Sequence, residues 1–245
     1  MKQGLYTIAE NAPITGSVLR LRLTGDVSAL TAPGQFVNIR LDGNFLRRPI
    51  SVSDWDGESF TLLYKVVGAG TKQLSEMQPG QTLDVLTGLG NGFDLSGAGE
   101  APLLIGGGIG SAPLYRLAKE LIRAGKPVTV ILGFNTADEV FYEDEFRALG
   151  AKVLVTTADG SYGIKGFVTA ALPGLDYSDY CACGPEPMLK AVFRACPKPG
   201  QLSFEERMGC GFGACMGCTC RTVTGWKRIC REGPVLRKEE ILRDA

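Results

Sequence analysis

The sequence predicts a β-barrel or sandwich, followed by a parallel α/β sheet and a small cysteine-rich C-terminal module. Three observations support this prediction. Residues 1–97 contain short strand-like segments, residues 98–197 alternate between strands and helices, and five of the eight cysteines lie between positions 210 and 230. Because a chain of 245 residues is long enough for more than one core, we expect domains with the bounds 1–97, 98–197 and 198–245.

The first segment has the pattern of many short β-strands. Residues 18–23 alternate apolar and polar side chains, and residues 36–41 and 60–64 are also strand-like. Arg48-Pro49-Ile50-Ser51 is expected to end a further β-segment, and Gly68-Ala69-Gly70-Thr71 is expected to be a turn. Many short strands at this spacing are typical of a barrel or a sandwich.

The second segment alternates between strands and helices. Strands are expected at 102–105, at 128–132, at 152–156 and up to Ala182, and helices at 111–124, at 143–149 and up to Ala195. The first strand runs into a glycine turn at 106–110. This alternation indicates a parallel α/β sheet.

Composition excludes several classes of function. Lys+Arg and Asp+Glu are both 26, so the zero net charge does not indicate a nucleic-acid or membrane-surface partner. The N-terminus lacks an apolar signal core and no apolar run is long enough for a membrane span, so we expect a cytoplasmic protein. The absence of histidine excludes Ser-His and Cys-His catalysis, so we expect bound cofactors to supply the chemistry and assign no catalytic residue.

The cysteine run is the most informative motif. Cys210, Cys215 and Cys218 form a C-x4-C-x2-C pattern, which with a later fourth cysteine is the plant-type spacing for a [2Fe–2S] cluster. The alternative is a structural zinc site, because Cys215 and Cys218 also form a CxxC pair. Zinc sites usually combine two such pairs, and the second is missing here. On spacing alone, both Cys220 and Cys230 are candidates for the fourth ligand.

Two glycine-containing turns fit a pyrophosphate. The turn at 106–110 lies between a strand and a helix, where free N–H groups and the helix dipole favour an anion. Its spacing is not G-x-G-x-x-G, so an ordinary tight turn is an equal alternative. Cys183-Gly184-Pro185 is a second turn at a strand end, and ligands of open α/β sheets bind outside such ends.

The barrel segment carries a similar but weaker signal. Arg48, the glycine amides at 68–70 and the Thr71 hydroxyl suit a diphosphate, and Tyr64 offers a face for stacking. An ordinary barrel surface with an ion pair and two turns explains the same residues.

Taken together, the order of these motifs is similar to that in the ferredoxin-reductase superfamily, whose members have an FAD-binding β-barrel followed by an NAD(P) domain. The four motifs are Arg48-Pro49-Ile50-Ser51, Gly68-Ala69-Gly70-Thr71, the glycines at 106–110 and Cys183-Gly184-Pro185. The cysteine run with the preceding Glu206-Arg207-Met208-Gly209 closely resembles the electron-transfer subunit of class 1B, NAD-linked dihydroorotate dehydrogenase, and the likeness covers essentially the whole chain.

The resemblance implies the residues of three sites. FAD would be held by Arg48, Pro49, Ile50, Ser51, Leu63, Tyr64, Lys65, Gly70 and Thr71. NAD would be bound by Gly107, Gly108, Gly110, Cys183 and Gly184. The cluster ligands would be Cys210, Cys215, Cys218 and Cys230, because the family places the fourth cysteine before a Gly-Pro pair, here Gly233-Pro234. Cys220 is then a small, partly buried side chain.

The resemblance also implies the function. Electrons from an FMN-containing dihydroorotate dehydrogenase subunit would pass through the [2Fe–2S] cluster and FAD to NAD⁺, in pyrimidine biosynthesis. The partner would be that catalytic subunit, in a heterotetramer with two of each chain. No segment resembles an orotate site, so the chain alone is not expected to oxidise dihydroorotate. Met208, Phe212 and Met216 are expected to form the apolar part of the contact with the partner.

Two alternatives stay open. One is a subunit of an NADH-dependent ferredoxin:NADP oxidoreductase or a sulfide dehydrogenase, relatives that often replace the first cluster cysteine. The other is a zinc-bearing interaction module without redox chemistry, against which the flavin-type segments at 48–51 and 68–71 count. At the position that reads the ribose, Asn135 and Thr136 weakly favour NAD over NADP, with Asp138 as a possible acidic partner.

Overall fold

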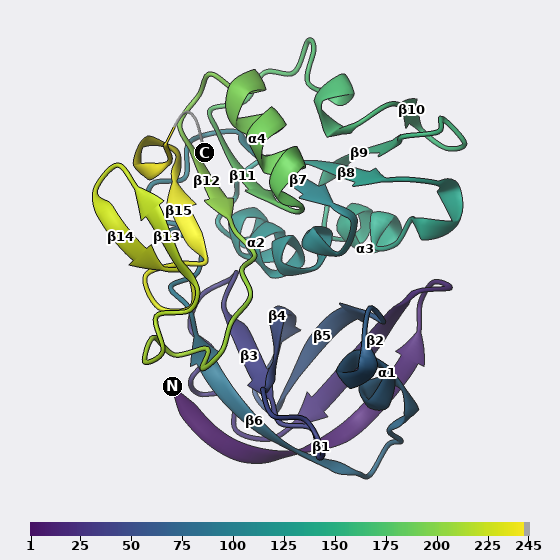
Figure 1. The fold of residues 1–245 in the computed structure, drawn as a ribbon. Helices are drawn as coiled ribbons and strands as arrows, with labels where there is room; N and C mark the ends of the chain where they lie inside the picture. Colours follow the sequence, from purple (N-terminus) through teal and green to yellow (C-terminus); the bar gives the residue numbers. More distant parts are fainter. Residues whose placement is uncertain (243–245) are drawn as a thin grey trace.

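A closed antiparallel barrel forms the N-terminal part of the structure, a computed structural model that describes residues 1–242 (Figure 1). Its strands, in the order β1-β2-β5-β4-β3-β6, are β1 (Lys2–Pro13), β2 (Val18–Thr24), β3 (Phe36–Ile39), β4 (Arg48–Trp55), β5 (Ser59–Lys65) and β6 (Thr82–Leu89). The barrel interior contains alternate side chains of each strand, among them Tyr6 and Phe60, whose rings meet edge to face at 5.3 Å. The prediction of a barrel or sandwich is thus confirmed as a barrel.

Two local predictions in the barrel were wrong. The segment at 48–51 does not end a strand but begins β4, because its residues pair with Phe36–Ile39 of β3. Residues 69–71 do not form a simple turn but the first turn of helix α1 (Ala69–Glu76). The Thr71 hydroxyl accepts hydrogen bonds from the N–H groups of Val67 and Gly68, which satisfies donors at this helix start.

A seven-stranded sheet forms the second part, in the order β10-β9-β8-β7-β11-β12-β15. Its parallel strands are β7 (Pro102–Gly107), β8 (Thr129–Phe134), β9 (Lys152–Thr157), β10 (Ile164–Lys165), β11 (Asp179–Cys183) and β12 (Gly200–Ser203). The edge strand β15 (Val235–Arg237) is antiparallel. The predicted parallel α/β sheet is therefore confirmed.

Helices cover both faces of this sheet. Helices α2 (Ala112–Arg123) and α3 (Glu143–Ala148) pack on one face, and α4 (Glu186–Ala195) packs on the other (Figure 1). Short 3₁₀ turns occur at Gly108–Ser111, Ala137–Glu139, Val168–Ala171 and Lys238–Glu240. None of the helices within residues 1–242 has the length and apolar character needed to cross a lipid bilayer.

The C-terminal module packs against both larger parts. Its hairpin, β13 (Thr219–Thr222) and β14 (Gly225–Arg228), lies beside the sheet, and the loop before it reaches the barrel (yellow and yellow-green in Figure 1). A small core joins Cys218, Ile229 and Cys230 of the module to Phe36 and Leu86 of the barrel. The three predicted domain bounds stay a prediction. Strands β12 and β15, on either side of the cysteine loop, lie within the predicted third domain but belong to the sheet of the second part.

Candidate functional site

A cleft of about 360 Å³ lies between the barrel and the sheet. Most of the residues predicted for FAD and NAD line this cleft, namely Pro49, Ile50, Ser51, Leu63, Tyr64, Lys65, Thr71, Gly110 and Cys183. Strands β4 and β5 and the first turn of α1 present the barrel residues, whereas the turn after β7 and the end of β11 present Gly110 and Cys183. The topology therefore brings the two predicted groups of residues to one place.

The predicted residues that do not line the cleft are within two positions of residues that do. The Arg48 guanidinium lies against Gly70, and donates to Asn44 Oδ1 at 2.5 Å. Gly107 and Gly184 lie beside each other, with the side chain of Met188 against both. Gly108 begins the 3₁₀ turn that leads into α2. The starts of α1 and α2 both lie near the cleft, because Thr71 of α1 and Ala112 of α2 line it.

The two glycine turns are in direct contact. A Cβ added at Gly110 would lie 2.5 Å from the carbonyl oxygen of Cys183 and 2.6 Å from the Cα of Gly184. Only glycine allows the backbones after β7 and β11 to approach this closely. The expectation that both turns line one crevice is therefore met by the geometry, whereas their binding of NAD stays a prediction.

Burial raises the pKa of several groups that line the cleft. Burial raises the pKa of the Cys183 thiol to about 12. Burial likewise raises the pKa of Tyr64 to about 12, against the opposing effect of its hydrogen bond to Asn11 Oδ1 at 2.9 Å. Glu205 is open to solvent yet stands beside the cleft wall, where loss of hydration raises the pKa of its carboxyl. The apolar and aromatic part of the lining suits a flat aromatic ring system, while Lys65, Glu205 and Glu206 add charged groups to the same cleft.

A set of ion pairs fixes the second part against the barrel. Arg116 of α2 donates to Asp54 Oδ1 of β4 at 3.1 Å, and Lys119 Nζ lies 2.6 Å from Asp54 Oδ2. The Arg116 guanidinium also lies 3.9 Å from the ring centroid of Trp55. Because α2 begins directly after the glycine turn at 108–111, these contacts hold that turn at a defined place across the cleft.

The cysteine loop directs backbone N–H groups at its sulfurs. Cys210 Sγ accepts from the N–H groups of Phe212, Ala214 and Cys215 at 3.5, 3.2 and 3.4 Å. Cys215 Sγ accepts from Cys210 and Gly217, and Cys218 Sγ accepts from Cys230 at 3.4 Å. Burial alone would raise the pKa of Cys210, but the N–H bonds lower this pKa to about 6. Such N–H donors stabilise metal-bound thiolates.

The four thiols form two pairs. Cys210 and Cys215 exchange N–H···S bonds, and the Cys230 N–H donates to Cys218. Burial and the neighbouring Cys218 raise the pKa of Cys230 to about 12, so the Cys230 thiolate needs a cation beside it. Within residues 1–242, no three Cys, Asp or Glu side chains converge as ligands of a single metal ion do. Two thiol pairs fit a two-iron cluster that is held by four cysteine thiolates.

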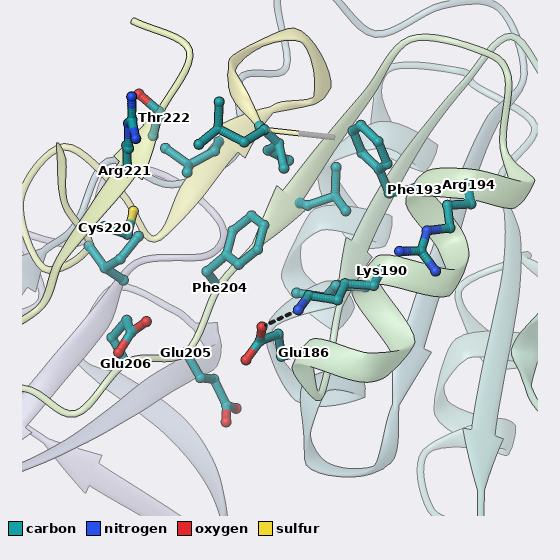
Figure 2. A pocket seen from close by; sticks show the side chains of 16 residues that line it. Glu186, Lys190, Phe193, Arg194, Phe204, Glu205, Glu206, Cys220, Arg221 and Thr222 are labelled. Carbon is teal, nitrogen blue, oxygen red and sulfur yellow. Dashed lines mark ion pairs between the residues drawn. The ribbon is translucent and has the colours of Figure 1, made fainter. Parts of the chain in front are cut away.

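Cys220 faces a different cavity. This cavity of about 150 Å³ lies between α4 and the C-terminal module, with Phe193 and Phe204 among its apolar walls (Figure 2). Figure 2 shows the Cys220 sulfur on its module side and the Lys190–Glu186 ion pair, at 2.8 Å, on its helix side. Burial raises the pKa of the Cys220 thiol. These observations favour Cys230 over Cys220 as the fourth ligand.

Sequence reasoning missed one wall of the cleft. Residues of the segment between β12 and the cysteine loop line it, namely Ser203, Phe204, Glu205, Glu206 and Met208, together with Phe36, Val67, Ile109, Ala112, Pro113 and Pro234. The nearness of Met208 to Cys210 in sequence was a usable signal for the segment. Phe36 carried no signal, because its place depends on contacts with residues nearly 200 positions away.

The barrel, the nucleotide-type cleft and the paired thiols define a ferredoxin-reductase-like protein with an iron–sulfur module. The model of the "Iron-sulfur cluster binding domain of dihydroorotate dehydrogenase B" matches residues 205–242, and that of the "Oxidoreductase NAD-binding domain" matches residues 104–194. The chain is 45% identical to the dihydroorotate dehydrogenase B (NAD(+)) electron transfer subunit of a Geobacillus species, over 99% of each chain. It is 43% identical to that of Fusobacterium nucleatum, over 96% of each.

Solved structures agree with this relationship. A structure described as the NADH-dependent reduced ferredoxin-NADP oxidoreductase matches with a TM-score of 0.88 and 34% identity, over 98% of this chain and 91% of that one. A flavohaem-like FAD/NAD-binding domain from Vibrio cholerae shares the fold, with a TM-score of 0.68 and 21% identity over 79% of this chain and 92% of that one. The chain belongs to the family of dihydroorotate dehydrogenase B electron transfer subunits, and its activity is electron transfer in an NAD-linked oxidoreductase.

The paired thiols predict unequal effects of two serine substitutions. We expect Cys210→Ser to lose most of the iron and acid-labile sulfide of the purified chain, because one of two ligands of an iron is replaced by a poorer one. Cys220→Ser should retain both, since its sulfur faces the cavity beside α4. Iron and sulfide analysis after anaerobic purification measures the difference. Equal iron loss in the two variants would contradict the ligand assignment.

The contact between the glycine turns predicts the effect of a single methyl group. Gly110→Ala should weaken NADH binding roughly tenfold or more, because the two turns must separate. Gly97→Ala is the matched control, since a Cβ there meets nothing within 4 Å. Titration with NADH measures the dissociation constants. Unchanged affinity in Gly110→Ala would show that the turn takes no part in NADH binding.

Proposed function

We propose that the chain conducts electrons from an FMN-bearing catalytic subunit to NAD⁺, with a [2Fe–2S] cluster and FAD bound in its own structure. One observation carries the proposal: Phe36 of β3 lines the cleft and belongs to the same small buried core as Cys218 and Cys230. The cleft and two of the paired thiols therefore share one buried core, which supports electron transfer between groups held in these two places.

The proposed cluster ligands are Cys210, Cys215, Cys218 and Cys230. Their support is the pairing of the thiols and the N–H groups that point at three of the four sulfurs. The loop backbone supplies these donors without any side chain, which leaves the surrounding surface free for a partner.

The proposed FAD residues lie on the barrel side of the cleft. Tyr64, Leu63 and Ile50 offer an apolar wall, Arg48 a positive charge, and the start of α1 offers the N–H groups of Gly70 and Thr71 for the diphosphate. When bound, FAD accepts electrons singly from an iron–sulfur centre and delivers two of them as a hydride. The proposed NAD residues, Gly107, Gly108, Gly110, Cys183 and Gly184, face it from the sheet side.

Acidic groups at the end of β8 support a preference for NAD over NADP. Glu139 Oε2 accepts from Asn135 Nδ2 at 2.9 Å, and Asp138 bonds to Thr136. Carboxylates at this strand end suit a ribose 2′-hydroxyl and repel a 2′-phosphate. The Lys65 Nζ, 3.4 Å from Glu139, partly offsets this charge.

The exposed part of the cysteine loop is the proposed contact with the catalytic subunit, in an assembly of two of each chain. Phe212 and Met216 are 40% and 54% exposed beside the thiols. Met208, in contrast, is half-buried and lines the cleft, so it supports the loop from within. Exposed apolar side chains next to a redox centre are typical of a docking surface.

The proposed placement of the NADH site in this chain and the dihydroorotate site in the partner predicts the activities of the purified single chain. With FAD and cluster present, it should oxidise NADH with an artificial acceptor such as ferricyanide, but should not turn over dihydroorotate, because the residues for that substrate belong to the partner. Addition of the catalytic subunit should restore dihydroorotate-dependent NAD⁺ reduction. Steady turnover of dihydroorotate by the single chain would contradict the proposal.

The docking surface predicts the effect of a charge at its centre. Phe212→Asp should weaken co-purification with the catalytic subunit and lower dihydroorotate:NAD⁺ activity at least tenfold, because a carboxylate would be desolvated in the contact. NADH:ferricyanide activity of the chain should persist. Phe167→Asp is the matched control, since Phe167 is 73% exposed and follows β10, the edge strand opposite β15 in the sheet. Intact co-purification of Phe212→Asp would exclude this face.

A further inference from the structure

The outer face of strand β3 carries a buried polar side chain beneath the cysteine loop. Val37 and Ile39 point into the barrel core, so Phe36 and Asn38 point to the outside of the barrel. Asn38 is nevertheless only 1% exposed, because the C-terminal module covers this face. In Figure 1 the yellow-green loop descends to the barrel beside β3 and β6.

Asn38 binds the first cysteine of the loop directly. Its Nδ2 donates to the backbone carbonyl oxygen of Cys210 at 3.1 Å, across 172 positions of sequence. The next residue, Gly211, has a φ of +79°, and a Cβ there would lie 2.4 Å from Asn38 Nδ2. Glycine thus lets the loop close onto the amide. The bond fixes the residue whose sulfur accepts three backbone N–H groups.

The structure of the barrel wall does not explain an amide side chain at position 38. Within the described residues, Asn38 Oδ1 is buried and lacks a hydrogen-bond partner. A buried acceptor without a donor is unfavourable, and an apolar side chain of the same shape would suit a barrel wall at least as well. The bond to Cys210 is therefore the contact that explains an asparagine at this position.

The backbone of Asn38 pairs with a strand that lines the cleft. Its register partner on β4 is Pro49, which lines the cleft, and its neighbour Phe36 lines the same cleft. One residue therefore contacts the cysteine loop through its side chain and the proposed flavin strand through its backbone.

We propose that Asn38 is a positioning residue for electron transfer, which holds Cys210 at a fixed place on the barrel wall beside the cleft. Its amide sets the geometry of the loop around the first thiol pair and the separation between that pair and the flavin site. The proposal rests on the cluster ligands and the FAD site of the proposed function.

The test compares Asn38→Leu with Asn91→Leu in the complete complex with the catalytic subunit. Asn91 is a matched control, because its Nδ2 donates to the Val235 carbonyl at 2.7 Å and so also anchors the module, but without a bond to a cysteine. Iron and sulfide content, thermal unfolding, the EPR spectrum of the reduced cluster, its midpoint potential and its rate of reduction by NADH are measured for both.

The expected signature separates positioning from simple stabilisation. Asn38→Leu should alter the EPR g values, lower the midpoint potential and slow reduction of the cluster by NADH roughly tenfold or more, as is usual for partners of metal ligands. Its melting temperature should change little, since leucine fills the same space. Asn91→Leu should lower the melting temperature and leave the EPR spectrum unchanged.

Each remaining outcome either supports or overturns the proposed role of Asn38. Loss of the cluster from Asn38→Leu alone supports the proposal, because it shows that the loop depends on this amide. Unchanged spectrum, potential and rate in Asn38→Leu overturn it, as do equal changes or equal cluster loss in both variants. Retention of full iron by Cys210→Ser would refute the ligand assignment itself, independently of the behaviour of Asn38.

Discussion

The burial of the outer face of β3 by the cysteine loop is the contact on which the arrangement of the whole chain depends. A barrel strand normally has one wet face, but all four residues of β3 are buried. Val37 and Ile39 complete the barrel core, while Phe36 joins the small core that contains Cys218 and Cys230. This four-residue strand therefore contributes to the barrel core, to the wall of the cleft and to the surface on which the cysteine loop packs.

The second constraint is the rigid connection between the two larger parts. Arg116 and Lys119 share Asp54, and the guanidinium covers Trp55, so α2 is tied to β4 through charge, hydrogen bonds and packing. The C-terminal module adds β12 and β15 to the sheet while its loop rests on the barrel. The three parts therefore hold the cleft from three sides, which suits carriers that must keep constant separations.

Local sequence patterns predicted much of the fold and of the cluster site. Features that depend on contacts between distant parts of the chain could not be predicted from such patterns. The spacing of Cys210, Cys215 and Cys218 indicated an iron–sulfur site, because three ligands come from one short loop. Strands with strict alternation, such as β2, were also evident. Strand β1 was missed, since its polar and turn-forming residues hide a 12-residue strand that is stabilised by pairing with β2 and β6. The roles of Phe36 and Asn38 depend on residues about 170 to 200 positions away, and no local pattern reports such contacts.

The most direct measurement is the anaerobic visible spectrum of the purified chain before and after addition of NADH. If the cleft and the thiol pairs hold FAD and the cluster beside the outer face of β3, the flavin bands and the broad iron–sulfur absorbance should both bleach within the same mixing experiment. Bleaching of the flavin with the iron–sulfur absorbance unchanged would contradict the central claim, because it would show that the two carriers are not in electronic contact.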